Sequence, residues 1–416
     1  MANAWMTIKD AGTWVANESL YLLRSKLHVS PFFNTDYSKD FKLSYATTGD
    51  TIKVPYPMNY DIRNGLDYAP PAAAQKFATI TIGEPFGVDV PEIDSLEAAI
   101  STPRSKEEFS NRYLKPAMLK LAQEIDSRCA LYAFVHAAGV VGALGTNPST
   151  FDATSGASRQ KMQELGAPDG ERGMIVPPSV VRAVKAANIG LFNPVQDISK
   201  TFRTGLLGTT DGFEWYESMS LYRHTAGTMA TSGATLTAAL ANGASTAALT
   251  CTTGETVKAG DKFSIASVLP VHPMTKRTFG TDAKTFTITA AGTAASSALT
   301  ISFSPAMYYT GPHQNVDAQP AASAALTFWP GTSAPSAKVG NVGLALPQNA
   351  FALVGLELEK FTDQEVCSFS RDPDSGISIR FLAGGDIKSS KRIRRFDVCI
   401  GFGELYNDLA HVVACG

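Results

Sequence analysis

Residues 257–265 read Val257-Lys258-Ala259-Gly260-Asp261-Lys262-Phe263-Ser264-Ile265. Gly260-Asp261 is a turn signal, and the apolar side chains of Phe263 and Ile265 alternate directly after it, which predicts a short strand. The same alternation returns downstream at Phe286 and Ile288, and again at Leu299, Ile301 and Phe303. Short strands at this spacing, separated by glycine, serine and threonine turns, are typical of a small β-barrel or sandwich.

The predicted strands fall within a segment of unusual composition. From Ala226 to Gly340 the chain is rich in Ala, Thr, Ser and Gly, with ten charged residues in 115 positions. The whole chain of 416 residues has 36 basic and 38 acidic residues, so the flanks carry most of the charge. The segment therefore reads as an all-β domain inserted into a larger domain, and the Pro-, Ala- and Ser-rich residues 309–339 are expected to be its return loop.

Upstream of the insert, residues 49–91 predict an extended β-ribbon. Apolar side chains alternate from Thr51 to Met58, and the prolines in this run indicate an edge strand. Asn64-Gly65 is a turn signal, and a second alternating run contains Ile80, Ile82, Phe86, Val88 and Val90. A ribbon of two strands is marginally stable alone in water, so we expect it to lie on a neighbouring subunit. The candidate inter-subunit contacts are Tyr60, Asp61, Arg63, Asn64 and Tyr68 of the ribbon, together with Trp14.

Two helices are predicted on either side of the ribbon. Residues 6–27 form the first, which either packs on the core of its own chain or docks on a neighbour as an arm. The second runs from about Ser105, with a capping box to Glu108, as far as His136. Pro116 is expected to kink it, and a length of about 30 residues gives a spine of roughly 45 Å.

The remaining flanks predict mixed α/β structure. Met174-Ile175-Val176 reads as a buried strand that leads into a helix over 180–188. After Val342 a buried run covers 351–354, a turn covers 372–376, and alternation from Ile377 to Phe381 predicts a further strand. A last strand is expected over 395–403.

Composition excludes several classes of protein. An apolar content of 44% supports a sizeable core, and a net charge of −2 gives no global drive toward nucleic acid. Neither a signal peptide nor a membrane span is predicted. The five cysteines are scattered without a C-x-x-C pair, so we expect them to be reduced and mostly buried.

Motifs for chemistry are weak throughout. Gly401-Phe402-Gly403 lacks the third glycine of a dinucleotide site and fits a close backbone approach in a strand instead. The residues from Asp372 to Gly376 lack the remaining calcium ligands of an EF-hand and fit a turn. The six histidines are dispersed and are expected at the surface or at helix ends. We therefore predict no catalytic residues, no cofactor, no metal and no enzymatic activity.

One dense run of positive charge stands near the C-terminus. It contains Lys388, Lys391, Arg392, Arg394 and Arg395. Such a run binds phosphates or nucleic acid in some proteins, but it has no interleaved aromatic residues for base stacking. We favour a solvated turn that pairs with acidic residues of the same or a neighbouring chain.

Read in order, these features resemble the major capsid proteins of tailed phages with the Hong-Kong-ninety-seven-type fold. The chain is most similar to the coat proteins of P-twenty-two-type short-tailed phages, which carry an inserted β-barrel. The ribbon from Gly49 to Pro91, the helix from Glu107 to Ala138 and the segment 257–265 carry the resemblance, followed by Thr285-Phe286-Thr287-Ile288-Thr289.

The resemblance implies an α+β fold with an N-terminal arm, an extended β-ribbon loop, a spine helix, a central α/β domain and an inserted all-β barrel-like domain. The corresponding segments are the arm at 1–48, the ribbon at 49–91, the spine helix and peripheral domain at 92–150, the first part of the central domain at 151–225, the insert at 226–340, and the return of the central and peripheral domains at 341–416.

It also implies the partners. The chain would form hexamers and pentamers of an icosahedral shell, with a scaffolding protein and a portal, and would contact packaged double-stranded DNA weakly and non-specifically. It would be made in the host cytoplasm and end in the virion, without a membrane; a decoration protein is left open.

Two other classes stay open at this stage. One is a ligand- or carbohydrate-binding protein with an appended β-module, in which Tyr308, Tyr309 and Trp329 form a sugar platform rather than packing the return loop. The other is a phage tail or tube protein, which also self-associates but with open or ring symmetry.

Overall fold

The structure is a computed structural model that describes residues 8–37, 51–57, 76–94, 110–168, 170–188, 208–231, 233–329, 338–359, 366–372, 375–386 and 391–416. The chain divides into two compact units. The first consists of Met1–Val54, Ala78–Cys129 and Phe351–Glu404, and the second of Pro55–Phe77, Ala130–Ala350 and Leu405–Gly416.

Among its described residues, the first unit contains two four-stranded sheets, the N-terminal helix and most of the long helix α4 (Lys115–His136). Its other elements are α1 (Ile8–Arg24), β1 (Thr51–Pro55), β2 (Phe77–Ile82), β3 (Phe86–Asp94), β18 (Phe351–Gly355), β19 (Val366–Arg371), β20 (Ser378–Asp386), β21 (Lys391–Val398) and β22 (Ile400–Glu404). The strand orders are β1-β2-β22-β18 and β19-β20-β21-β3.

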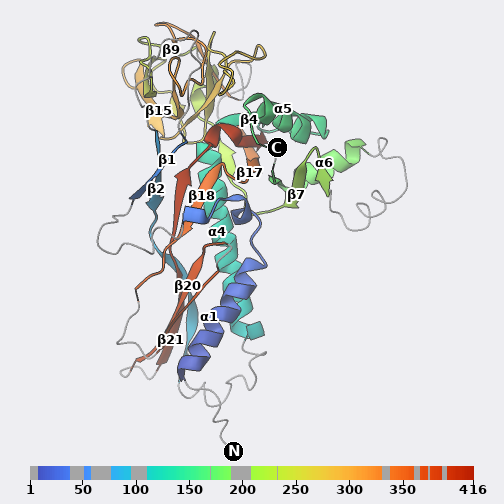
Figure 1. Ribbon diagram of the computed structural model, residues 1–416, viewed down its shortest axis with the longest axis vertical. Coiled ribbons are helices and arrows are strands. Elements are labelled where there is room, and N and C mark those ends of the chain that lie inside the picture. The colour runs from blue at the N-terminus through green and yellow to red at the C-terminus, as the bar shows by residue number, and fades with distance from the viewer. Residues whose placement is uncertain are drawn as a thin grey trace, which may run out of the picture. The chain divides into compact units, whose positions relative to one another are not determined.

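The N-terminal helix α1 packs on its own chain, against β19 and β20 (Figure 1). A glycine makes this close approach possible, because a Cβ on Gly12 would lie 2.4 Å from Cγ1 of Val366. Ser370 Oγ also donates to Asn17 Oδ1 at 2.7 Å. Of the two sequence-based alternatives for this helix, the structure shows packing within the chain.

The described part of the predicted ribbon divides between the two sheets. β1 and β2 are neighbours as expected, whereas the second alternating run is interrupted at Gly83 and continues as β3, which pairs with β21 in the other sheet. Pro85 cannot donate to a ladder, which explains the break. The predicted last strand is also two strands, β21 and β22, separated at Cys399. The two breaks meet, since Gly83 N donates to Ile400 O at 3.0 Å.

The long helix begins irregularly. A π-helical turn at Ser110–Leu114 precedes α4, and Pro116 stands in the first turn of α4. Proline lacks the amide donor of a regular helix, so a local change of helix type at this point is the expected accommodation. The predicted capping residues Ser105 and Glu108 lie outside the described residues.

The second unit contains a mixed sheet of order β4-β23-β17-β5-β7-β6, with β8 paired to β17. Its elements are β4 (Gly139–Gly142), α5 (Ala157–Glu164), β5 (Arg172–Val176), α6 (Pro178–Asn188), β6 (Thr209–Thr210), β7 (Phe213–Glu217), β8 (Arg223–Thr225), β17 (Val339–Pro347) and β23 (His411–Ala414). The buried strand β5 and the following helix α6 confirm the prediction for that stretch. β23 was not predicted, because its four residues are too few to show a period.

The same unit contains the barrel. Its sheet has the order β16-β12-β13-β15-β10-β9, with a short side pair β11–β14. The strands are β9 (Thr235–Leu236), β10 (Ala244–Thr250), β11 (Thr256–Val257), β12 (Lys262–Ile265), β13 (Thr285–Ile288), β14 (Gly292–Thr293), β15 (Ala298–Met307) and β16 (Leu326–Phe328). Thr235 of β9 makes a bridge to Ala325, next to β16, so the sheet nearly closes.

The barrel core confirms the alternation read from the sequence. Phe263, Ile265, Phe286 and Ile288 are buried in one cluster with the alternating residues of β15. The α+β class with a barrel-like all-β insert is therefore confirmed. The expected return loop is wrong in one respect, since β16 lies within it and fills the sheet next to β12. All five cysteines are unpaired, and four of them are buried.

Candidate functional site

The segment that opens β12 forms a joint between the barrel and the end of α4. Lys262 is fully buried, and its Nζ donates to the Phe134 carbonyl at 3.1 Å, to the Ala137 carbonyl and to Thr287 Oγ1 at 2.7 Å. Three acceptors match the three donors of an ammonium group. The lysine thus connects a barrel strand to helix residues more than 120 positions earlier in the chain.

Two threonines of β13 complete this contact. Thr287 Oγ1 donates to the Ala137 carbonyl at 2.6 Å, and Thr285 Oγ1 donates to the Ala138 carbonyl at 2.8 Å. The last carbonyls of a helix have no partner inside the helix, and its C-terminus attracts positive charge. The barrel therefore binds the Phe134 carbonyl in the last turn of α4 and the Ala137 and Ala138 carbonyls directly after it.

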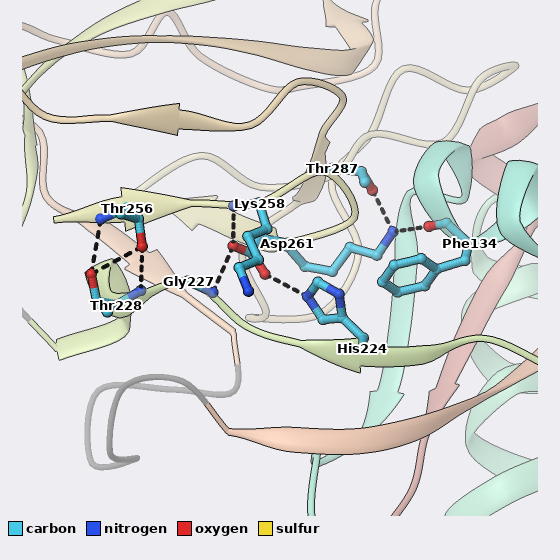
Figure 2. A network of polar contacts seen from close by, with 9 residues as sticks. Phe134, His224, Gly227, Thr228, Thr256, Lys258, Asp261 and Thr287 are labelled. Atoms are coloured by element: carbon cyan, nitrogen blue, oxygen red, sulfur yellow. Dashed lines mark hydrogen bonds and ion pairs between the residues drawn. The ribbon is translucent and has the colours of Figure 1, made fainter.

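The neighbouring carboxylate ties the joint to β8. Asp261 Oδ1 lies 2.7 Å from Nε2 of His224, while Oδ2 accepts from the backbone N–H groups of Lys258 at 2.7 Å and Gly227 at 3.1 Å. Figure 2 shows Asp261 with these three residues around it. Burial of the carboxylate is acceptable because both of its oxygens are hydrogen-bonded.

Gly260 is the residue that allows the close packing of the joint. Its φ is +94°, and a Cβ there would lie 2.1 Å from Cε1 of Phe134. The Phe134 ring also lies 4.8 Å from the His224 ring, centroid to centroid. Glycine is thus required both for the backbone conformation and for the space it leaves.

The environment of Lys262 is costly for a charge. Burial lowers its pKa well below the ordinary lysine value, and the nearby Asp261 carboxylate opposes that shift. The hydrogen bonds to two carbonyls and a hydroxyl replace the water that the side chain has lost. The arrangement joins three elements, and its chemistry is that of a structural contact.

Only part of this site is predictable from the sequence. Gly260, Asp261 and Lys262 belong to the opening signature of the insert, but no local pattern predicts their partners, because Phe134 and His224 are remote in sequence. The prediction that the histidines lie at the surface or at helix ends is wrong for His224 and His411, each of which is 1% exposed. One local feature does indicate a buried polar contact. Lys262 stands directly before an alternating apolar strand, in a segment with very few charged residues.

The predicted contact residues are placed only in part. Trp14 lies on α1 and is half-buried. Tyr60, Asp61, Arg63, Asn64 and Tyr68 lie outside the described residues, as does Lys388.

The rest of the basic run belongs to β21. Lys391 is opposite Asp94 of β3, and Arg395 is opposite Asp89. Arg395 also forms an ion pair with Asp397 at 2.7 Å, and this hydrogen-bonded contact raises the arginine pKa. Arg392 and Arg394 lie on the same strand. Acidic residues of the same unit therefore face part of this run.

The weaker motifs have structural explanations. A Cβ on Gly403 would lie 2.5 Å from Cγ1 of Ile80, the close approach expected in a strand. Ser375 donates to Asp372 in a turn between β19 and β20. Among the described residues, no group of three or more His, Cys, Asp or Glu side chains is arranged to hold a metal ion. Within the same ranges no helix is both long and apolar enough to cross a membrane.

The proposed aromatic platform is occupied by internal contacts. Trp329 Nε1 donates to the Gly142 carbonyl at 3.2 Å, and its backbone N–H donates to the Lys262 carbonyl at 2.7 Å. Tyr309 packs against the barrel core. These contacts do not favour the carbohydrate-binding alternative.

Fold and site together define an α+β protein whose inserted barrel is hydrogen-bonded to the C-terminal end of its long helix. The family model described as "P22 coat protein - gene protein 5" matches residues 42–407, so the chain belongs to the P22 coat protein family. It is a major capsid protein of a tailed phage and a component of the virion.

The chain is also similar to chains of solved structures. Similar chains come from Mycobacterium phage Che8 (10% identity, TM-score 0.47, covering 93% of this chain and 90% of that one) and from the capsid of cyanophage P-SCSP1u (12%, 0.41, 89% and 84%). The capsid of Ralstonia phage GP4 is a third (7%, 0.42, 95% and 91%). No curated protein matches the chain.

Proposed function

We propose that this coat protein acts by self-association, forming the hexamers and pentamers of an icosahedral head around double-stranded DNA, and that it catalyses no reaction. The observation that carries the proposal is the family match over residues 42–407, which includes both the ribbon and the insert. The buried joint supports it, because Lys262 and Asp261 are occupied with structural contacts.

Each segment has a proposed role in the shell. The ribbon at 49–91 reaches over an adjacent subunit, with Tyr60, Asp61, Arg63, Asn64 and Tyr68 as contacts and Trp14 of the arm at 1–48 as a further one. The segment 92–150 forms the spine helix and part of the peripheral domain, and 151–225 is the first part of the central domain, which lines the capsomer centre. The segment 341–416 completes both the central and the peripheral domains. The insert at 226–340 stabilises the folded subunit through the joint.

The proposed partners are a scaffolding protein, a portal and packaged DNA, and the chain is made in the host cytoplasm before it enters the virion. A near-neutral net charge suits a shell that contacts DNA weakly. We assign the basic run of β21 to pairing with acidic residues rather than to DNA, since Arg395 forms an ion pair with Asp397 and lies opposite Asp89 within the same unit.

The test is deletion of residues 61–74, followed by electron microscopy and sedimentation of the chain co-expressed with its scaffold. We expect a folded subunit, with an unchanged circular dichroism spectrum, that fails to close shells. The intact chain and a variant with the same segment replaced by an equal length of Gly and Ser are the controls. Normal particles from the deletion would refute the role of the ribbon.

Self-association itself is tested by the intact chain. If it stays monomeric in the presence of scaffold, the shell function is wrong, whatever the ribbon does.

A further inference from the structure

A cleft of about 430 Å³ opens within the second unit, beside the joint. It is lined by α5, by the start of β4, by the loop before β13 and by the turn before β23. Its volume is in the range of small-molecule sites. Six titratable side chains line it and have no role in the joint: the basic Lys161, Lys284 and His411, and the acidic Glu164, Asp282 and Asp408.

The two lysines have hydrogen-bonding capacity left over. Lys161 Nζ donates to the Val140 carbonyl at 2.8 Å, and Lys284 Nζ donates to Asp408 Oδ1 at 2.7 Å. An ammonium group has three donors, so each lysine keeps two that have no protein acceptor within the described residues. The Lys284 side chain is only 5% exposed, so its remaining donors are not freely hydrated.

His411 supplies an acceptor. Its Nδ1 lies 3.1 Å from the Leu409 carbonyl, which can only accept, so Nδ1 carries the proton. Burial, together with the positive charge of Lys161, lowers the pKa of His411 to about 3. The ring is therefore neutral at pH 7, and Nε2 is a lone-pair acceptor without a partner among the described residues.

Acidic side chains also line the cleft. Asp408 neutralises part of the positive charge of the two lysines, and Asp282 and Glu164 lie close enough to Lys161 to raise its pKa, against the larger lowering by burial. Asp282 is exposed and Glu164 is half-exposed, so water screens both. At His411 the lysines act in the same direction, and only Asp408 opposes them among the charged groups.

We propose that this cleft binds a protonated oxyanion of the hydrogen-phosphate class. Oxygens of the ligand accept from Lys161 and Lys284, and its O–H donates to Nε2 of His411. Phosphate keeps at least one O–H at neutral pH and sulfate has none, so the histidine predicts a preference for phosphate over sulfate. Hydrogen bonds from the two lysines alone would bind phosphate and sulfate with equal affinity.

The test is thermal unfolding of the purified, unassembled chain at pH 7, titrated with sodium phosphate or sodium sulfate at constant ionic strength. A ligand that binds only the folded chain raises the unfolding midpoint. We expect phosphate to raise it more than sulfate, and Lys161→Gln to weaken the apparent phosphate affinity about tenfold or more, the effect of one lost charge-assisted hydrogen bond.

Lys120→Gln on the exposed face of α4 removes the same charge elsewhere and should respond like the unaltered chain. Equal effects of phosphate and sulfate, or an unchanged response in Lys161→Gln, would overturn the proposal. If Lys161→Gln does not fold, phosphorus NMR on the unaltered chain decides, because absence of phosphate line broadening also overturns it. Shell assembly does not enter the measurement, so the two proposals fail independently.

Discussion

Single residues at the joint have little freedom to vary, and Gly260 has the least. Its backbone lies in the left-handed region, and the ring of Phe134 occupies the space that a side chain would need. These two requirements are separable, because Gly254 has a similar φ of +89° with nothing within 4 Å.

We predict that Gly254→Ala costs about 1 kcal/mol from backbone strain alone. Gly260→Ala should cost about 1–3 kcal/mol more, because the added methyl group displaces Phe134 from the joint. Urea denaturation of both variants measures the difference. Equal losses of unfolding free energy in the two variants would mean that Phe134 can move away from the added methyl group without destabilising the fold.

The buried His411 predicts a pH dependence. Its pKa is lowered from 6.5 to about 3, chiefly by burial. Below pH 6.5 this histidine is therefore protonated in the unfolded chain but stays neutral in the folded chain. The contribution of His411 to the free energy of unfolding is therefore at its maximum above pH 6.5, and it decreases as the pH falls toward 3. Between pH 7.5 and pH 5 the difference in unfolding free energy between the natural chain and His411→Gln should change by up to about 2 kcal/mol, to the disadvantage of the natural chain. A constant difference across this interval would contradict the assignment.

At the scale of elements, the C-terminus of α4 depends on the barrel. Lys262→Met keeps most of the side-chain volume but removes the donors to Phe134 and Ala137. We predict a loss of about 3 kcal/mol in unfolding free energy, since buried carbonyls lose their partner. Lys258→Met, four residues earlier and exposed, is the matched control and should change stability by less than about 0.5 kcal/mol. A similar effect of both substitutions in chemical denaturation would show that the cap contributes nothing.

Elements with a clear period were predictable from the sequence, and those set by remote partners were not. The strands around Phe263, Phe286 and Ile301 follow from alternation, because their pattern reports which face is buried. The division of residues 80–90 between two sheets does not follow, since the alternation continues unchanged in parity through Pro85. The short strands β16 and β23 exist because a neighbouring strand pairs with them, and no local pattern records that neighbour.

At the scale of the molecule, the barrel has a core of its own. All the residues of its buried cluster lie between Met229 and Phe328. We therefore predict that a fragment covering residues 223–340 folds alone, with cooperative thermal unfolding followed by circular dichroism. The fragment lacks Phe134 and Ala137, so Lys262→Met should destabilise it much less than it destabilises the whole chain. An unfolded fragment would mean that the barrel requires the joint to form at all.

The joint also sets an order of events during synthesis. Lys262 is made 128 residues after Phe134, whose carbonyl it caps. At translation rates of about 5–20 residues per second, the end of the helix waits roughly 6–26 s for that lysine. During this interval the nascent chain has an uncapped helix end. Chaperones can bind there, or the chain can associate incorrectly, before the barrel emerges from the ribosome.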